Sequence, residues 1–368
     1  MSSASRLLLY CRAGFERECA QEATAIAAEM GCEGFVRARP DSAFALFSAH
    51  DEAMGEDLAR HVELRRLVFA RQLVRAGELI TLTEADRVAP IVAAARGLGK
   101  RFAELFLEMP DTNDGKALAS LTRPLRPHLE KALRKAGIDF ADAAAEERLH
   151  VFFVGGLACH VGVSEVSASS PWPMGIPRLR MPSGAPSRST LKLAEALQEF
   201  LDPKSLERRL APETTAVDLG ASPGGWTWQL VRRGVSVIAV DNGEIDAALL
   251  DSGLVKHRRT DGLTYRPSDP VDWMVCDIVE SPSRVARLAA RWIAEGWCRE
   301  SIFNLKLPMK KRWEEVLRCR GIIDEALGGS GYYLRMKQLY HDREEITGYL
   351  ARRKKGSDPF FHGEEKGV

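Results

Sequence analysis

The stretch that decides the fold is Val217-Asp218-Leu219-Gly220-Ala221-Ser222-Pro223-Gly224-Gly225-Trp226, in which an apolar strand leads into a glycine-rich turn and then a helix. Glycines let a backbone approach a ligand closely, and Asp218 at the strand end offers a carboxylate to the polar groups of a nucleotide-like cofactor. A dinucleotide site of the form G-x-G-x-x-G would need glycine where the sequence has Ser222. The spacing therefore argues against NAD and favours S-adenosylmethionine, with an ordinary strand-to-helix turn as the alternative.

Strands and helices alternate after this turn. We expect strands at 235–240, 271–276 and 301–307, a short strand reaching 261, and helices at 245–251, 282–295 and 310–327. Asp241 follows the first of these strands, where an acid can accept the hydroxyls of a ribose. Alternation predicts a parallel sheet with helices on both faces, whereas segments 332–340 and 345–351 are joined so tightly that they must be antiparallel. A Rossmann-like α/β sheet with a terminal antiparallel hairpin is typical of S-adenosylmethionine-dependent methyltransferases.

The front of the chain differs from this pattern. Strands at 7–11, 44–47 and 67–74 and helices at 15–30 and 56–66 suggest a β-α-β-β-α-β, ferredoxin-like domain over residues 1–80. A second α+β domain over 81–166 has helices at 88–98 and 118–136 and strands at 103–108 and 149–155. Five prolines in 167–186 indicate an extended linker. The cofactor-binding domain then occupies 187–355, and a short polar tail 356–368 ends the chain.

Composition limits the function classes. A hydrophobic fraction of 45% and a charged fraction of 28% in 368 residues are those of a globular protein, and no apolar run reaches membrane-spanning length. We therefore expect a cytoplasmic protein with no membrane partner. The seven cysteines contain no C-x-x-C pair, so we expect no metal site. The net charge is only +1, but basic runs at 310–312 and 352–355 favour an RNA partner. No exposed apolar stripe stands out, which favours a monomer.

Methyl transfer to a ribose hydroxyl needs a base, because the hydroxyl itself is a weak nucleophile. A lysine can serve if burial and a second cation lower its pKa from about 10.4 toward about 7 to 8. Lys306 lies at a strand end, where active sites of parallel sheets gather, although a lysine there is often simply solvated. We expect three partners from separate elements to converge with it, namely Lys192, Asp277 and Glu345.

These residues resemble the K-D-K-E tetrad and cofactor loop of FtsJ-like ribose 2′-O-methyltransferases. Within that group the chain is similar to the bacterial RlmM family, which methylates one cytidine ribose in 23S rRNA. The segments that carry the similarity are spread over nearly the whole chain, at 8–12, 111–113, 173–179, 185–193, 304–312 and 339–345.

The resemblance implies several assignments. Residues 81–166 would be a THUMP domain that binds RNA, and the partner would be 23S rRNA, either naked or in an early large-subunit precursor. Lys306 would accept the proton. The S-adenosylmethionine site would be lined by Ser189, Ser222, Pro223, Gly224, Gly225, Asp241, Asp261 and Asp277. Glu344 is adjacent to Glu345, and strand alternation points the two to opposite faces, so we expect Glu345 to complete the tetrad because the alternating strand begins there.

Other functions remain possible from the sequence. Methylation at C5 of a pyrimidine would use a nucleophilic cysteine, and Cys276 precedes Asp277, although alternation turns it away from that carboxylate. Amino-group methylation commonly uses an Asn/Asp-Pro-Pro-aromatic loop, where this chain has Asp277-Ile278-Val279-Glu280. A different rRNA or tRNA nucleotide is a further option, and so is a non-catalytic RNA-binding protein that retains the cofactor fold.

Overall fold

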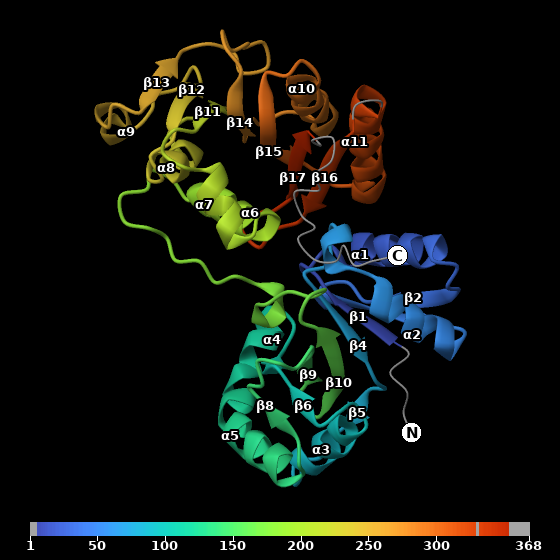
Figure 1. Ribbon diagram of the computed structural model, residues 1–368. Coiled ribbons are helices and arrows are strands. Elements are labelled where there is room, and N and C mark those ends of the chain that lie inside the picture. Colours follow the sequence, from blue (N-terminus) through green and yellow to red (C-terminus); the bar gives the residue numbers. More distant parts are fainter. Residues whose placement is uncertain (1–5, 329–330, 353–368) are drawn as a thin grey trace, which may run out of the picture. The chain divides into compact units, whose positions relative to one another are not determined.

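A computed structural model describes residues 6–328 and 331–352 of the chain. The chain divides after Pro177 into two compact units, each with a main β-sheet of its own (Figure 1). Of the predicted basic run 352–355, only Arg352 lies within the described residues, and the predicted tail 356–368 lies outside them. Among the described residues, no helix is long and apolar enough to cross a membrane.

The first unit contains one eight-stranded sheet, with strand order β2-β3-β1-β4-β10-β9-β7 and β5 paired to β10. Its strands are β1 Arg6–Tyr10, β2 Gly34–Ala38, β3 Phe44–Ala49, β4 Gln72–Ala76, β5 Ile80–Thr81, β7 Leu105–Glu108, β9 Glu147–Gly155 and β10 Ala158–Glu165. Short strands β6 Arg101–Phe102 and β8 Asp139–Phe140 pair separately. The sheet therefore runs through both regions that we expected as domains 1–80 and 81–166.

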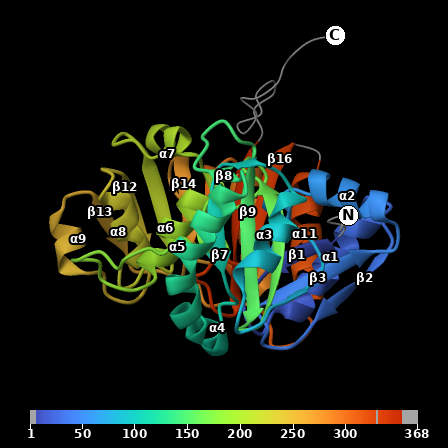
Figure 2. The ribbon, with the colours of Figure 1, turned by 90° about the horizontal axis from the view of Figure 1, so that it is seen from below.

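The helices of this unit are α1 Glu16–Glu29, α2 Glu52–His61, α3 Val88–Arg96, α4 Asn113–Ala117 and α5 Ala119–Lys135. Apolar residues of α3 and α5 share a core cluster with alternate residues of β9 and β10, which is why these helices cover one face of that half of the sheet (Figure 2). The first half has the predicted β-α-β-β-α-β order.

The predicted helix 56–66 and strand 67–74 were wrong in their bounds. Asp51 caps α2 by accepting a hydrogen bond from the amide of Met54, so the helix starts earlier, and a separate 3₁₀ turn, η1, covers Leu64–Arg66. The buried Glu22 carboxylate accepts the amides of Val68 and Phe69 at 2.5 and 2.9 Å, which holds this segment out of the sheet until β4 begins.

The predicted linker 167–186 is only partly a linker, because its first half packs within the first unit. Gln72 and Ser170 exchange two hydrogen bonds, of 3.0 and 3.1 Å, between the Gln72 side-chain amide and the Ser170 backbone. The amide of Met174, in the 3₁₀ turn η2 Pro173–Gly175, donates to Glu108. The first unit accordingly continues to Pro177.

The second unit is built on a seven-stranded sheet of order β13-β12-β11-β14-β15-β17-β16. The strands are β11 Thr215–Leu219, β12 Ser236–Val240, β13 Val255–Arg258, β14 Val271–Cys276, β15 Cys298–Lys306, β16 Tyr332–Lys337 and β17 Glu345–Arg352. β17 is antiparallel to both of its neighbours, so β16 runs parallel to β15. The predicted Rossmann-like sheet with a terminal antiparallel hairpin is confirmed, with β17 inserted between β15 and β16.

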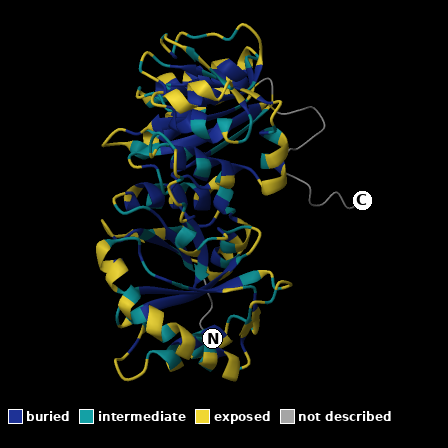
Figure 3. Ribbon diagram, turned by 90° about the vertical axis from the view of Figure 1, so that its left-hand side faces the viewer, coloured by how far each residue is buried: buried dark blue, intermediate teal, exposed yellow. Residues whose placement is uncertain are grey.

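Helices cover both faces of this sheet. They are α6 Thr190–Phe200, α7 Pro203–Arg209, α8 Gly225–Val231, α9 Ala247–Asp251, α10 Pro282–Ala294 and α11 Arg312–Leu327. Leucines and Phe200 of α6 pack with Trp226 of α8, Trp273 of β14, Ile302 of β15 and Tyr349 of β17 in one core cluster. The central strands β11, β14, β15 and β17 are mostly buried, whereas the edge strands β13 and β16 are only partly buried and the helices keep exposed outer faces (Figure 3).

Candidate active site

The alternation of β15 and β17 brings polar side chains to one edge of the sheet. Register places Ile302 opposite Tyr349, Asn304 opposite Thr347 and Lys306 opposite Glu345. Residues opposite one another on adjacent strands point to the same face, and Ile302 and Tyr349 belong to the core cluster beneath α6. The same face therefore changes from apolar to polar as β15 reaches its carboxyl end.

Three of the four predicted catalytic residues are in direct contact. Lys192 Nζ, from the first turn of α6, lies 2.5 Å from Glu345 Oε2 and 3.3 Å from Asp277 Oδ1. Asn304 Nδ2 donates to Asp277 Oδ1 at 2.8 Å and lies 3.4 Å from Glu345 Oε2. The side chains of Lys192, Asp277 and Glu345 are 18%, 21% and 15% exposed, so the cluster is largely buried but open to solvent on one side.

Lys306, the fourth predicted residue, ends β15 and has an exposed side chain. It lies two residues beyond Asn304 on the same face of the strand and directly across from Glu345. Within residues 6–328 and 331–352, no side chain forms an ion pair or hydrogen bond with Lys306. Its amine is therefore available to a substrate that approaches this edge of the sheet.

The charge state of the cluster follows from its contacts. Burial lowers the pKa of Lys192, but Asp277 and Glu345 raise it by more, so its pKa lies above the ordinary value and the amine stays protonated. Burial raises the pKa of Asp277, and the neighbouring Lys192 cation partly opposes that shift. Lys192 is thus a fixed cation held between two carboxylates.

The structure separates the two adjacent glutamates. Glu345 contacts Lys192, whereas Glu344 accepts a hydrogen bond of 2.6 Å from Arg312 of α11. Alternation turns the two side chains to opposite faces of the sheet, as the sequence pattern predicted.

The glycine-rich turn after β11 is shaped for close backbone approaches. Gly220 has a φ of +78°, and a Cβ built there would lie 2.9 Å from the side chain of Ile278. A Cβ on Gly225 would lie 2.2 Å from Ser189 Oγ and 2.3 Å from Ser187 Oγ. Side chains at these positions would collide with the segments that enclose the turn. The short distance at Gly225 also shows that Ser189 lies against the glycine pair.

The remaining predicted cofactor residues surround this turn. Asp241 accepts hydrogen bonds from the amides of Ser222 at 3.1 Å and Gly243 at 2.7 Å, which ties the turn after β12 to the glycine-rich turn. Pro223 and Gly224 complete that turn before α8 begins. Asp261 is exposed and accepts the amide of Leu263 at 2.9 Å, next to Gly262, which packs against Leu219 and Gly220.

Asp218 is buried and accepts a hydrogen bond of 2.7 Å from the hydroxyl of Thr227. Its second oxygen, Oδ1, is buried and has no hydrogen-bond partner among the described residues. Burial raises the pKa of Asp218 to about 7, since the charged form is poorly solvated there. An unpartnered buried acceptor beside the glycine-rich turn fits a ligand that brings a positively charged or donating group.

Family models match all three regions of the chain. The RlmM ferredoxin-like domain matches residues 4–74, the N-terminal region of ribosomal RNA large subunit methyltransferase M matches 86–165, and FtsJ-like methyltransferase matches 185–321. The ribosomal RNA large subunit methyltransferase M of Methylococcus capsulatus is 52% identical over 95% of this chain and 99% of that protein. The Cellvibrio japonicus protein of the same name is 49% identical over 94% of this chain and 99% of its own length.

The chain belongs to the ribosomal RNA large subunit methyltransferase M family. It is an rRNA methyltransferase, and its cofactor is S-adenosylmethionine, as the sequence predicted. TrmN from Thermus thermophilus, a solved structure, covers 95% of this chain and 99% of its own at 16% identity, but a TM-score of 0.35 is too low to carry an argument.

Sequence reasoning missed the polar residues that support the cluster. Asn304 touches both carboxylates, and Thr347 and the buried Asp342 lie behind it. Glu195 of α6 accepts the amides of Tyr340 and His341 at 2.7 and 2.9 Å, which fixes the turn before β17. Asn304 could have been found from its spacing, because a polar residue two positions before a strand-end lysine shares that lysine's face.

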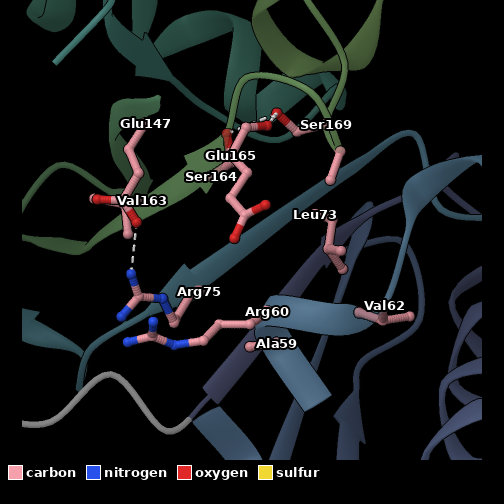
Figure 4. Close-up of a pocket in the computed structure, with 11 residues that line it drawn as sticks. Ala59, Arg60, Val62, Leu73, Arg75, Glu147, Val163, Ser164, Glu165 and Ser169 are labelled. Atoms are coloured by element: carbon pink, nitrogen blue, oxygen red, sulfur yellow. Dashed lines mark hydrogen bonds and ion pairs between the residues drawn. The ribbon is translucent and has the colours of Figure 1, made fainter. Parts of the chain in front are cut away.

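A small cavity in the first unit is not a competing site. It is lined by residues such as Arg75, Glu147, Ser164 and Ser169, with an ion pair of 2.7 Å between Arg75 and Glu147 (Figure 4). Its volume of about 20 Å³ holds about one water molecule. Within residues 6–328 and 331–352, there is no group of three or more His, Cys, Asp or Glu side chains that could hold a metal ion.

Proposed function

We propose that this family member transfers a methyl group to the 2′-hydroxyl of a cytidine in 23S rRNA. Lys306 acts as the general base, and Lys192, Asp277 and Glu345 orient it and the target hydroxyl. The observation that carries the proposal is the contact of Lys192 with both carboxylates, one of which, Glu345, lies directly across the strand register from Lys306. Together, these four residues would form the K-D-K-E tetrad that the sequence suggests.

S-adenosylmethionine supplies a methyl group on a positively charged sulfur. The methyl group would pass to the 2′-oxygen, the electron pair of the sulfur–carbon bond would remain on sulfur, and the amine of Lys306 would take up the hydroxyl proton. Lys306 must be uncharged when it accepts that proton. Asp277 and Glu345 keep the Lys192 cation in place beside the strand end that carries Lys306.

The cofactor would lie against the glycine-rich turn. Ser189, Ser222, Pro223, Gly224 and Gly225 would line the site with backbone and small side chains. Asp218, Asp241, Asp261 and Asp277 would contribute acceptors for its amino and hydroxyl groups. The unpartnered Oδ1 of Asp218 and the tight packing around Gly225 support this assignment.

Base methylation through a cysteine is poorly supported. Cys276 is fully buried, and burial raises the pKa of its thiol to about 12, so the nucleophilic thiolate would be rare at neutral pH. Trp273 and Val275 of β14 belong to the core cluster beneath α6, so alternation directs Cys276 to the other face of the sheet. The thiol is thus remote from the cluster around Lys192.

For the substrate, we propose naked 23S rRNA or an early large-subunit precursor, bound by a monomer. The exposed side chains of Lys310 and Lys311 follow β15 directly, where they can contact phosphates near the reacting ribose. Residues 81–166 would supply further RNA contacts as a THUMP domain. Such phosphate contacts give affinity that falls as salt increases.

The proposal is tested by identifying the product. Wild-type protein is incubated with S-adenosylmethionine and 23S rRNA that lacks the modification, and nuclease digestion is followed by nucleoside mass spectrometry. We expect a methylated ribose on cytidine with an unmodified base. A methyl group on a base, or on another nucleoside, would contradict the proposal.

A calorimetric titration with S-adenosylhomocysteine completes this test. Saturable binding with one site is expected. A protein that binds RNA but neither the cofactor product nor any methyl donor would be a non-catalytic RNA-binding protein.

A further inference from the structure

Asn304 lies at the centre of the candidate active site, although it belongs to none of the four predicted catalytic positions. It is 3% exposed, on β15 two residues before Lys306. Its Nδ2 is 2.8 Å from Asp277 Oδ1 and 3.4 Å from Glu345 Oε2. One amide group therefore contacts both carboxylates that hold Lys192.

The orientation of this amide is fixed by chemistry as well as by packing. Carboxylates only accept hydrogen bonds, so the NH₂ group must face Asp277 and Glu345. The carbonyl oxygen then faces β17, where the Thr347 hydroxyl donates to it at 2.8 Å. Thr347 is fully buried, so water does not compete for that contact.

A buried carboxyl group continues the chain behind Thr347. Asp342 Oδ1 and Oδ2 lie 3.3 and 3.0 Å from the Thr347 oxygen, and Oδ2 also accepts the amide of Leu339 at 3.0 Å. Burial raises the pKa of Asp342 well above its ordinary value, which favours the protonated carboxyl. Because a hydroxyl has one hydrogen, Thr347 can donate to Asn304 only if Asp342 donates to Thr347, and a protonated Asp342 can do so.

We propose that Asn304 is a positioning residue for methyl transfer. Its amide, held in one orientation by Thr347 and Asp342, keeps Asp277 and Glu345 at the spacing that fixes Lys192 near the strand end carrying Lys306. The inference rests on the proposed function of this site. It adds to the four predicted residues a series of hydrogen bonds that runs from the buried Asp342 through Thr347 and Asn304 to the carboxylates.

A positioning role has a pH signature. Burial raises the pKa of Asp277, and the hydrogen bond from Asn304 is one of the contacts that lower it. Loss of that donor raises the pKa, so Asp277 becomes protonated at a higher pH and releases Lys192. The acid limb of the pH–rate profile should therefore move upward. The charged or titratable groups that interact with Asp277 include Lys192 of α6, Asp218 of β11 and Glu345 of β17, together with Cys276 next to it in the chain.

The decisive variants differ by one hydroxyl. Thr347→Val removes the hydroxyl and keeps the shape of the side chain, whereas Thr347→Ser keeps the hydroxyl. Asn304→Ala removes the amide itself. Ser301→Ala is the matched control, because Ser301 is a fully buried hydroxyl on the same strand that contacts Met274 Sδ at 3.7 Å instead of the cluster.

Single-turnover methyl transfer to unmodified rRNA is measured for each variant between about pH 6 and 9. We expect Asn304→Ala to lose about 100-fold and Thr347→Val about 10-fold in rate, with the acid limb shifted to higher pH. Thr347→Ser and Ser301→Ala should stay within about threefold of wild type with no shift. Affinity for S-adenosylhomocysteine should be unchanged in Thr347→Ser and Ser301→Ala, which leave Asp277 undisturbed.

The outcomes separate the two proposals. If wild type forms 2′-O-methylcytidine but Thr347→Val matches Thr347→Ser in rate and pH profile, the positioning role of Asn304 is wrong while the proposed function stands. A variant that loses melting temperature but keeps its rate per folded molecule leads to the same conclusion. If wild type forms no 2′-O-methylated product, the proposed function itself fails.

Discussion

Each unit of this protein contains a buried polar network, and the two differ in what they can reach. In the first unit, Glu108 accepts the hydroxyl of Tyr10 at 2.7 Å and contacts His150 at 2.8 Å, while His150 contacts Ser164 at 2.8 Å. In the second unit, Lys192 lies between Asp277 and Glu345. Both networks join segments that are far apart in the sequence.

Their exposure separates them. The side chains of Glu108 and His150 are 0% and 1% exposed, whereas Lys192, Asp277 and Glu345 are each 15% to 21% exposed beside the exposed Lys306. The first network is sealed, contains an acid, a histidine and a serine, and has no room for a substrate. Residue types that often act in catalysis are therefore not enough to make an active site, because the site must also be open to a substrate, as it is at the sheet edge of the second unit.

The largest expected effect comes from removing the cation of the second network. Lys192→Met leaves Asp277 and Glu345 facing each other, so the pKa of Asp277 rises further and the cluster rearranges. We expect single-turnover methyl transfer to fall by at least about 100-fold. Lys204→Met, an exposed lysine on α7, is the matched control and should keep the wild-type rate. A Lys192→Met rate near that of the control would show that this network is as passive as the one in the first unit.

Breaking the sealed network should affect stability instead of catalysis. Glu108→Ala leaves the Tyr10 hydroxyl and the Met174 amide without their buried acceptor, so the free energy of unfolding should fall by about 2 to 3 kcal/mol. Urea denaturation measures this loss. Glu104→Ala is the control, since Glu104 is 50% exposed and pairs with Arg148, and it should cost less than about 1 kcal/mol.

Expressing the methyl-transfer rate of Glu108→Ala per folded molecule separates an effect on catalysis from an effect on stability. That rate should be the same for Glu108→Ala and wild type. A well-folded Glu108→Ala protein with lost catalysis would overturn the contrast between the two units.

A smaller effect is expected at Asp218, where a buried acid adjoins the open site. Its folded pKa of about 7 lies above the unfolded value, so protonation favours the folded state. This contribution is complete below about pH 4 and disappears as pH rises through 7, with a loss of about 1.4 kcal/mol between pH 6 and 8.

Asp218→Asn keeps an acceptor for Thr227 but cannot ionise. The free energy of unfolding of this variant should therefore not fall between about pH 6 and 8 as that of the wild type does. Urea unfolding of the cofactor-free proteins at three pH values measures the difference. Parallel pH dependences for wild type and Asp218→Asn would show that Asp218 does not titrate in this range.

The smallest effect should come from Cys276. Because its thiol is fully buried on the other face of β14, Cys276→Ala should change the methyl-transfer rate less than about twofold and the free energy of unfolding by about 1 kcal/mol. Rate and urea midpoint are measured together. A large loss of rate with normal stability would revive the possibility of a cysteine-dependent base methyltransferase.

The sequence predicted the second unit better than the first for a physical reason. Three central strands of the second unit, β11, β12 and β14, are short, mostly apolar and followed by turn residues, so their positions are visible from composition alone. In the first unit, β2 was missed because its side chains are mostly exposed and include Arg37. β10 was missed because it contains Gly162, where a Cβ would lie 2.4 Å from the carbonyl oxygen of Arg75 on β4.

The site shows the same division. Strand-end position suggested Asp277 and Lys306, and alternation favoured Glu345, which the structure places against Lys192. The spacing of Asn304 to Lys306 was visible, but its contact with Thr347 was not, because Thr347 is 43 residues away and only the antiparallel register brings the two together. Contacts across strands that are distant in sequence depend on register, which a single sequence does not fix.

The most direct test of the account is the single-turnover rate of Lys306→Ala. Lys256→Ala is the matched control, because Lys256 is also an exposed strand lysine but lies in β13, at the opposite edge of the sheet. With saturating rRNA and S-adenosylmethionine, we predict that Lys306→Ala is slower than wild type by at least about 100-fold while Lys256→Ala stays within about threefold. Equal rates for Lys306→Ala and wild type would contradict the central claim that Lys306 accepts the proton from the ribose hydroxyl.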